Sequence, residues 1–249
     1  RGLGDVYKRQ RLTVRDVAKK GGVLVGFHEK ASSYVCDMHA CPILTQNVSD
    51  MIDPLRELIS VLDMRQRMPQ IEVAVGGDGR TALVFRHLDP VSPEDMEKLL
   101  AFGRAHGADI WLQPKGPETA HAVNPEDEKK LGLELTEFGV RIAFKPTDFT
   151  QVNHALNETM VGRAVRLLGL EPDHKVADFF CGLGNFTLPL APCSPRVLRD
   201  PKAWSPALVK GQLKTDWLRK QPSVRGIFLR GANRTGKSSG RPWAASTAC

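Results

Sequence analysis

The order of apolar and polar positions predicts a mixed domain of strands and helices in the first half of the chain. Short apolar runs bounded by glycine, proline or charged residues are typical of strands. Seven such runs occur before residue 147: residues 23–28, 33–38, 71–75, 81–85, 109–113, 133–135 and 140–144. Glycines at 76, 77 and 79 separate the third run from the fourth, so we expect a hairpin there.

Helical spacing of apolar residues predicts two helices in the same region. One covers residues 47–62, and the other begins after a cap at Ser92, has Pro93 in its first turn and ends near His106. Residues 114–130 are rich in proline and charge and are expected to form a loop. Hairpins combined with helices indicate an α+β domain over residues 11–147.

The pattern changes to a helix, a strand and a glycine turn between residues 148 and 191. Apolar residues at helical spacing predict a helix over residues 151–168, which Gly169 ends. Its expected buried face consists of Val152, Leu156, Met160, Ala164, Leu167 and Leu168. Residues 175–179 are predicted to form a buried strand, and the glycine turn follows directly. This is the layout of a nucleotide-type ligand site at the carboxyl end of a parallel strand.

Both ends of the chain depart from these patterns. Residues 1–10 belong to no pattern that follows, and we interpret them as a non-native leader. Residues 192–249 hold 6 of the 17 prolines and 3 of the 4 tryptophans, with little periodicity. Pro189, Pro192 and Pro195 are expected to interrupt the helix after the turn, and neither a crossover nor a second parallel strand is expected. We therefore interpret the tail as a frameshifted or foreign segment.

The charge of the chain is concentrated in that tail. The whole sequence has 35 Lys+Arg and 28 Asp+Glu, a net charge of +7. Residues 192–249 contain 12 basic and 2 acidic side chains, which leaves 23 basic and 26 acidic side chains in residues 1–191. The part with a recognisable pattern is therefore mildly acidic, and its charge predicts no basic patch for nucleic acid.

Length, hydrophobic content and cysteine usage limit the number of domains, the chance of a membrane span and the cellular compartment. A chain of 249 residues that is 41% hydrophobic can form one large or two modest domains. It has no apolar run of about 18 residues, so a membrane span is not expected. Five scattered cysteines and the lack of a secretory signal are typical of a cytoplasmic protein. No feature of the sequence indicates a protein partner.

The turn over residues 178–185 carries the strongest chemical signal. Gly182 and Gly184 permit positive φ angles and a close approach of the backbone to a ligand. Phe180 can flank an adenine or a methionine chain, and Asn185 can donate and accept hydrogen bonds. The dinucleotide fingerprint needs a third glycine two residues after Asn185, where this chain has threonine, so NAD is disfavoured. A plain strand–helix turn explains the same two glycines equally well.

Two longer motifs decide between these readings. The segments TDFTQVN (residues 147–153) and DFFCGLGNFTLPLA (residues 178–191) resemble the start of the methyltransferase domain in the RNA uracil-5-methyltransferases. Within that family, the match is closest to the bacterial enzymes that act on large-subunit (23S) ribosomal RNA. The segment from GFH (residues 26–28) to CPIL (residues 41–44) resembles the central domain of the same enzymes, so the resemblance covers about residues 22–191.

The resemblance implies a fold, an activity and a cofactor. The fold is α/β: a central α+β domain over residues 11–147, followed by the incomplete beginning of a Rossmann-like class I methyltransferase domain over residues 148–191. The implied activity is S-adenosylmethionine-dependent methylation of uracil C5 in ribosomal RNA, which would be the partner of the protein. The implied cofactor-binding residues are Gln151, Phe180, Gly182, Gly184 and Asn185.

The resemblance also places the catalytic cysteine farther along than the residues present here. In this chemistry a thiolate adds to uracil C6, so that C5 becomes nucleophilic towards the methyl group, after the base has been flipped out of its stack. Cys181 corresponds to a structural cysteine of the family, and Cys193 and Cys249 lie in the atypical tail. No catalytic residue is therefore assigned, and we expect this chain to be inactive in methyl transfer.

Cys41 has three interpretations. A cysteine before a proline is usually a free buried thiol. The resemblance implies that Cys41 is instead the last of four cysteine ligands of an iron–sulfur (4Fe–4S) cluster, with the other three expected before residue 11, together with an RNA-binding barrel domain. A zinc site formed by His28, Cys36, His39 and Cys41 is the third possibility, although its Cys-x4-Cys spacing is loose.

The tail contains two further candidates. Asp200 could bind ribose hydroxyls after a second strand, but the family's glutamate corresponds to Pro201. Residues 231–238 match the phosphate-binding pattern G-x-x-x-x-G-K-[ST] and follow a possible strand at residues 226–230. A P-loop nucleotide-binding protein is therefore one alternative function, although Pro242 would stop the helix that the loop needs. A non-catalytic metal- or RNA-binding module over residues 11–147 is the other.

Overall fold

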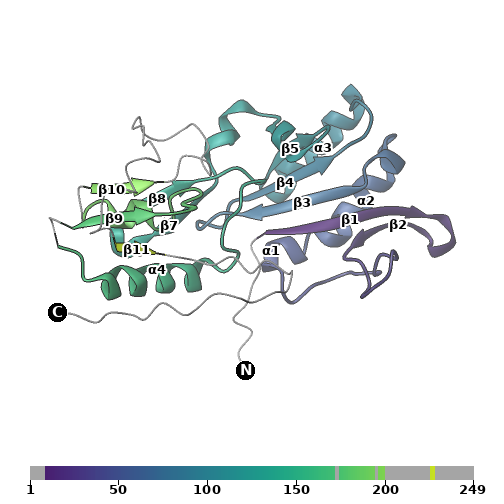
Figure 1. The fold of residues 1–249 in the computed structure, drawn as a ribbon. Coiled ribbons are helices and arrows are strands. Elements are labelled where there is room, and N and C mark those ends of the chain that lie inside the picture. The colour runs from purple at the N-terminus through teal and green to yellow at the C-terminus, as the bar shows by residue number, and fades with distance from the viewer. Residues whose placement is uncertain (1–8, 172–173, 194–195, 200–224, 228–249) are drawn as a thin grey trace.

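The protein has an α/β fold (Figure 1), and a computed structural model describes residues 9–171, 174–193, 196–199 and 225–227. Its main sheet has six strands in the order β2-β1-β3-β4-β5-β6. These strands are β1 (Arg9–Val17), β2 (Gly22–Gly26), β3 (Gln70–Val75), β4 (Thr81–Arg86), β5 (Ala108–Gln113) and β6 (His121–Ala122). Neighbouring strands are antiparallel except β4 and β5, which are parallel and joined by α3 (Pro93–His106).

Strand β1 was not expected from the sequence, and it lies second from the edge of the main sheet. It begins at Arg9, two residues before the start predicted for the central domain, and Arg9 pairs with Ala74 of β3. Leu12 and Val14 point into the core, whereas Arg11 on the opposite face is exposed. Arg9, Arg11 and Arg15 obscured this strand, because they give the segment a polar average although Leu12 and Val14 on the other face are buried.

The predicted strand at residues 33–38 is wrong. The structure has only an isolated bridge between His28 and Val35, supported by the hydrogen bond from Cys36 N–H to the Phe27 carbonyl oxygen at 2.9 Å. Val35 is buried while Tyr34 and Cys36 on either side are exposed. One anchored side chain therefore holds this loop against the end of β2, without the regular ladder of a strand.

The predicted helix over residues 47–62 is divided into α1 (Gln46–Ser49) and α2 (Ile52–Ser60). Pro54 explains the break, because a proline ring clashes with the carbonyl group four residues earlier, here that of Asp50. The apolar positions of the prediction are nevertheless all buried: Val48, Met51, Ile52, Leu55, Leu58, Ile59 and Leu62. The periodicity identified the buried face, although it missed the interruption.

Helix α3 has the bounds that the sequence predicts. The Ser92 hydroxyl oxygen accepts a hydrogen bond from Asp95 N–H at 3.1 Å, and Pro93 occupies the first helical position. Gly107 ends the helix in the left-handed conformation at φ 62°. The predicted hairpin is also confirmed, because β3 and β4 pair over their whole length around the glycine turn.

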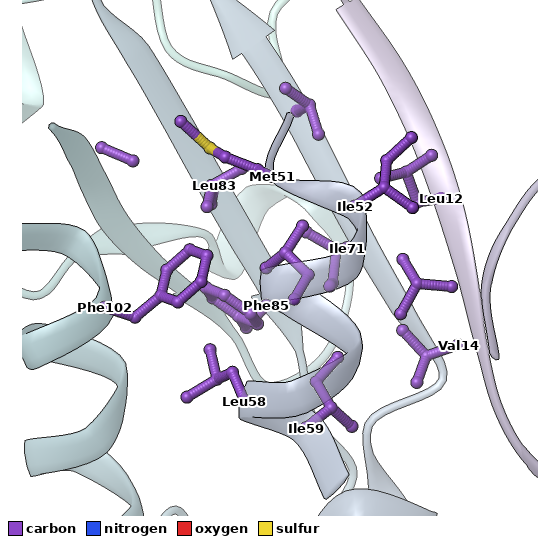
Figure 2. Packing of buried hydrophobic residues seen from close by; sticks show 14 of the residues in the cluster. Leu12, Val14, Met51, Ile52, Leu58, Ile59, Ile71, Leu83, Phe85 and Phe102 are labelled. Atoms are coloured by element: carbon purple, nitrogen blue, oxygen red, sulfur yellow. The ribbon is translucent and has the colours of Figure 1, made fainter. Parts of the chain in front are cut away.

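One face of the main sheet packs against α2 and α3 (Figure 2). The side chains that meet there come from β1, β3, β4, α3 and the region of α2, as Leu12, Ile71, Phe85, Phe102 and Ile59 illustrate. All five are buried. This first core needs residues from 12 to 112, so the central domain encloses a hydrophobic interior of its own.

The other face of the sheet contributes to a second core, which continues into the next part of the chain. It joins side chains of β3–β5, such as Trp111, to the hairpin of β7 (Gly132–Leu135) and β8 (Val140–Ala143). Both strands were predicted, but their pairing was not. Val161 of α4 (His154–Leu168) and Val176 of β9 (Lys175–Asp178) belong to the same core. The boundary predicted between residues 147 and 148 therefore lies within a shared core.

Short 3-10 helices connect the longer elements. They are η1 (Ala18–Lys20), η2 (Arg65–Arg67), η3 (Pro117–Thr119), η4 (Pro125–Lys129) and η5 (Thr136–Phe138). Two of them, together with β6, lie in the region 114–130 that was expected to be a loop without regular elements. Among the residues that the structure describes, no helix is long and apolar enough to cross a membrane.

The buried face of helix α4 overlaps the predicted one only in part, since Met160, Ala164 and Leu168 pack partly buried against the second core. It begins at His154, after the cap Asn153, and its buried residues are Asn157, Val161, Gly162 and Val165. Leu156 and Leu167, which were expected to be buried, are exposed. A polar asparagine and a glycine on the buried face misled the prediction, which followed the large apolar residues alone.

The last elements form a small parallel sheet in the order β10-β9-β11. It consists of β9, β10 (Arg196–Arg199) and β11 (Arg225–Ile227), and Figure 1 shows it beside α4, at the opposite end of the molecule from α2 and α3. The expectation that no second parallel strand follows the turn is therefore wrong. The crossover contains α5 (Thr187–Leu190), a helix of four residues that tolerates Pro189 because the first turn of a helix has no internal N–H partners.

Candidate cofactor-binding site

The turn after β9 has an unusual backbone. Within five residues, three residues have positive φ angles: Phe180 at 62°, Gly182 at 54° and Gly184 at 93°. The N–H of Gly184 donates to the carbonyl oxygen of Cys181 at 2.8 Å and closes the turn. The predicted need for glycine at 182 and 184 is confirmed, and the left-handed phenylalanine was not expected. A large side chain in this conformation is strained, and such strain concentrates at functional sites.

Phe180 extends from this turn into solvent. Its side chain is 78% exposed, whereas the neighbouring Phe179 is half-buried and Phe186 is buried. An exposed phenylalanine at the carboxyl end of a central parallel strand offers a flat apolar surface at the position where ligands of α/β sheets bind. The turn therefore presents an apolar surface to a ligand with an aromatic or apolar part.

Asp178, the last residue of β9, bonds across the turn to Thr187. It was not singled out from the sequence. Only 5% exposed, it accepts a hydrogen bond of 2.5 Å from the Thr187 hydroxyl through Oδ2. Burial raises the pKa of the Asp178 carboxyl, and the hydrogen bonds from Thr187 oppose that rise. An acidic residue at the last position of a buried strand was the only sign of this contact in the sequence.

The raised pKa of Asp178 predicts a pH dependence of stability. Because the folded protein holds this proton more tightly than the unfolded chain, the contribution of Asp178 to stability is fully present below the ordinary pKa of 3.8. This contribution is lost as the pH rises through the folded pKa. The variant Asp178→Asn can still accept from Thr187 but carries no charge. We therefore expect it to lose less stability than the wild type between acidic and neutral pH, as measured by urea unfolding. An equal loss in both proteins would contradict this assignment.

Asn185 joins the turn to helix α4. Its side-chain Oδ1 accepts from Asn157 Nδ2 at 2.8 Å, and its Nδ2 donates to Asn157 Oδ1 at 2.7 Å. Gln151 is exposed on the segment that leads into α4, two residues before the cap Asn153. The structure thus places Phe180, the two glycines and Asn185 in one turn, and it places Gln151 beside the start of the helix to which that turn is tied.

Two hollows in the described surface lie elsewhere. The smaller, of about 300 Å³, is adjacent to Gln151 and is lined by Gln10, Arg11, Glu72, Phe149, Thr150 and Val152. The larger, of about 720 Å³, lies where α3 meets β5. Two of its charged groups pair with each other, since Arg80 Nη1 lies 3.2 Å from both carboxylate oxygens of Asp109. Burial raises the pKa of Asp109, against the effect of Arg80. Neither hollow includes the glycine turn.

Cys41 lies in the first core and is 7% exposed. Its N–H donates to the Ser49 hydroxyl at 2.9 Å. Within the described ranges, no three His, Cys, Asp or Glu side chains come together in a way that could hold a metal ion. The structure does not bring three of the residues His28, Cys36, His39 and Cys41 together as the zinc alternative requires, and His39 instead contacts Asp53 at 2.7 Å. Cys41 as a single ligand of a larger site stays a prediction.

Three candidates of the tail, Asp200, Cys249 and the loop at residues 231–238, lie outside the residues that the structure describes. The strand expected before that loop is present in part as β11. Cys193 is partly buried, and its Sγ lies 3.8 Å from the Pro189 carbonyl oxygen.

Residues 27–205 match the family model of the tRNA (uracil-5-)-methyltransferases. This chain belongs to that family. The match includes the glycine turn, α4 and most of the central domain, and it ends before the P-loop pattern of the tail. It confirms the resemblance that the motifs at residues 147–153 and 178–191 indicated.

Named relatives show which branch of the family this chain is similar to. The chain is 58% identical over 183 residues to the 23S rRNA (uracil-C5)-methyltransferase RlmD of Cupriavidus necator. The aligned region covers 74% of this chain and 41% of the relative. The chain is 57% identical over 190 residues to the enzyme of the same name from Burkholderia lata, covering 76% of this chain and 40% of the relative. The chain thus spans about two fifths of the length of the curated relatives it matches.

A solved structure supports the fold of this family member. The Pyrococcus abyssi tRNA (uracil-54, C5)-methyltransferase, crystallised with S-adenosyl-L-homocysteine, superposes with a TM-score of 0.56 at 17% identity. The superposition covers 77% of this chain and 47% of that chain. The α/β fold with a parallel-strand sheet, expected from the sequence, is confirmed.

Proposed function

We propose that this chain is the central and cofactor-binding part of an enzyme that uses S-adenosylmethionine to methylate uracil C5 in large-subunit ribosomal RNA. The observation that carries the proposal is the turn after β9, where an exposed, left-handed Phe180 lies between buried Asp178 and Gly184. This turn lies within the residues that match the methyltransferase family model, and relatives similar to this chain are named 23S rRNA uracil-C5-methyltransferases. Both findings support the proposal. A location in the cytoplasm and an RNA partner belong to the same proposal.

The residues of the turn fit S-adenosylmethionine, which supplies the methyl group when bound. Phe180 offers an apolar face that can cover adenine or the methionine chain. Gly182 and Gly184 have no Cβ, so their backbone can approach the ligand closely. Asn185 can add one hydrogen-bond donor and one acceptor, and Gln151 is exposed for a further polar contact. The site-residue assignment is thus chemically consistent with the cofactor.

Cys181 fits a structural role in this proposal. It is buried, and its Sγ lies 3.9 Å from the Gly182 carbonyl oxygen. A buried thiol within the turn can support the backbone and exposes little surface to a substrate base. The nucleophile that attacks uracil is therefore not assigned to Cys181, in agreement with what the resemblance implies.

The described residues do not fit an iron–sulfur cluster by themselves. Cys41 is a single buried thiol, and a cluster needs four thiolates or their equivalents. In the part of the chain that the structure describes, no group of three potential ligands gathers around it. No step of the reaction is derived through a cluster, and metal analysis with a Cys41→Ser control is the measurement that addresses this residue.

Calorimetric titration with S-adenosylhomocysteine tests the proposal. We expect the chain to bind this stable product, and we expect Phe180→Ala to weaken binding about tenfold, because stacking on an aromatic ring contributes about 1–3 kcal/mol per base. Tyr34→Ala is the matched control, since Tyr34 is also an exposed aromatic residue but lies in the central domain. Wild-type affinity in Phe180→Ala, or an equal loss in Tyr34→Ala, would place the cofactor elsewhere.

A further inference from the structure

A reciprocal pair of side-chain amides links helix α4 to the turn after β9. Asn157 and Asn185, 28 residues apart in sequence, exchange two hydrogen bonds of 2.8 and 2.7 Å. Asn157 is 3% exposed and lies on the buried face of α4, whereas Asn185 is only partly buried. Each amide therefore uses one donor and one acceptor for the other, and only Asn185 is open to a ligand.

The pair leaves Asn185 with a defined set of free groups. An asparagine side chain has two N–H donors and two acceptor positions on its oxygen. One donor and one acceptor remain on Asn185 after the pairing. Rotation of the Asn185 amide alone would place donor against donor and acceptor against acceptor, so the buried Asn157 amide sets the direction of both. The backbone on either side is held as well, since Gly184 N–H bonds Cys181 O and Leu188 N–H bonds Gly184 O at 3.0 Å.

We propose that Asn157 is a positioning residue: it holds the Asn185 amide in the orientation that contacts S-adenosylmethionine. This inference rests on the proposed function, because it assigns the free donor and acceptor of Asn185 to that cofactor. A preorganised amide avoids the loss of side-chain freedom that binding otherwise requires. A buried polar residue on the inner face of α4 thereby has a role in binding without touching the cofactor.

The test separates positioning from simple structural support. Asn157→Leu keeps the branched shape of the side chain and removes both hydrogen bonds. Val161→Ala removes buried volume one turn farther along α4 and leaves the amide pair intact. Each variant, with Asn185→Ala and the double variant Asn157→Leu/Asn185→Ala, is measured for urea unfolding and for binding of S-adenosylhomocysteine.

We expect Asn157→Leu to weaken binding about three- to tenfold, the loss expected when one side chain is no longer preorganised. The double variant should bind no more weakly than Asn185→Ala, while Val161→Ala loses stability and keeps its affinity. Wild-type affinity in Asn157→Leu, or additive losses in the double variant, would overturn the positioning role while leaving the proposed function standing. If the wild-type chain does not bind S-adenosylhomocysteine, the proposed function fails and the inference fails with it.

Discussion

Replacing Gly184 by valine will destabilise the protein by about 3 kcal/mol and abolish measurable binding of S-adenosylhomocysteine. Gly184 has a φ angle of 93°, which a β-branched residue adopts only at a cost of about 1–3 kcal/mol. A Cβ at this position would also lie 3.2 Å from Leu188 Cγ and 3.4 Å from Leu188 Cδ1. The turn must shift to relieve both effects, and with it Phe180 and Asn185 lose their positions. Urea unfolding and calorimetric titration measure the two consequences.

Gly79→Val is the matched control for this substitution. Gly79 has a similar φ angle of 85°, but a Cβ added there would have nothing within 4 Å, and the residue lies in the β3–β4 turn. We expect a loss of about 1–3 kcal/mol from backbone strain alone, with unchanged affinity for S-adenosylhomocysteine. If Gly184→Val also retained wild-type affinity, the turn after β9 could not be the cofactor site.

Asp95→Ala is expected to destabilise the central domain by about 3 kcal/mol, because it leaves buried donors without a partner. The Asp95 carboxylate is fully buried in the first turn of α3. Its two oxygens accept the backbone N–H groups of Asp63 and Met64, each at 3.1 Å, and Lys98 Nζ lies 3.3 Å away. The side chain therefore ties α3 to the segment that follows α2. Thermal unfolding should show a midpoint lower by about 10 °C.

Glu94→Ala removes a carboxylate from the preceding position of the same helical turn and serves as its control. Glu94 is exposed, so its removal should change stability by no more than about 0.5 kcal/mol. If both variants lost the same stability, the negative charge near the α3 N-terminus would account for the stabilisation. The hydrogen bonds from Asp63 and Met64 would then contribute nothing.

The sequence predicted those features whose causes lie within a few residues. The bounds of α3 follow from Ser92, Pro93 and Gly107, which act on the helix that they adjoin. The positive φ angles at Gly182 and Gly184 follow in the same way from the local turn. The break between α1 and α2 was missed, although Pro54 was visible, because the apolar spacing continues through it.

Features that depend on distant parts of the chain were not predictable from local patterns. The buried face of α4 is chosen by what packs against it, and it contains Asn157 and Gly162 in place of two leucines. The amide pair with Asn185 joins residues far apart in sequence, and the Asp178–Thr187 contact spans the whole turn. Strand β10 likewise exists through its pairing with β9, which the apolar content of residues 196–199 alone did not suggest.

The second core has a consequence for how the chain holds together. Its side chains come from β3–β5 and the β7–β8 hairpin on one side of residue 147, and from α4, β9 and the turn on the other. The main sheet is thus buried on one face by its own helices and on the other partly by the segment over residues 148–191. Trp111 and Val176 share one interior, so neither segment can unfold without exposing apolar surface of the other. The two segments therefore share one hydrophobic core, even though the sequence divides them by pattern.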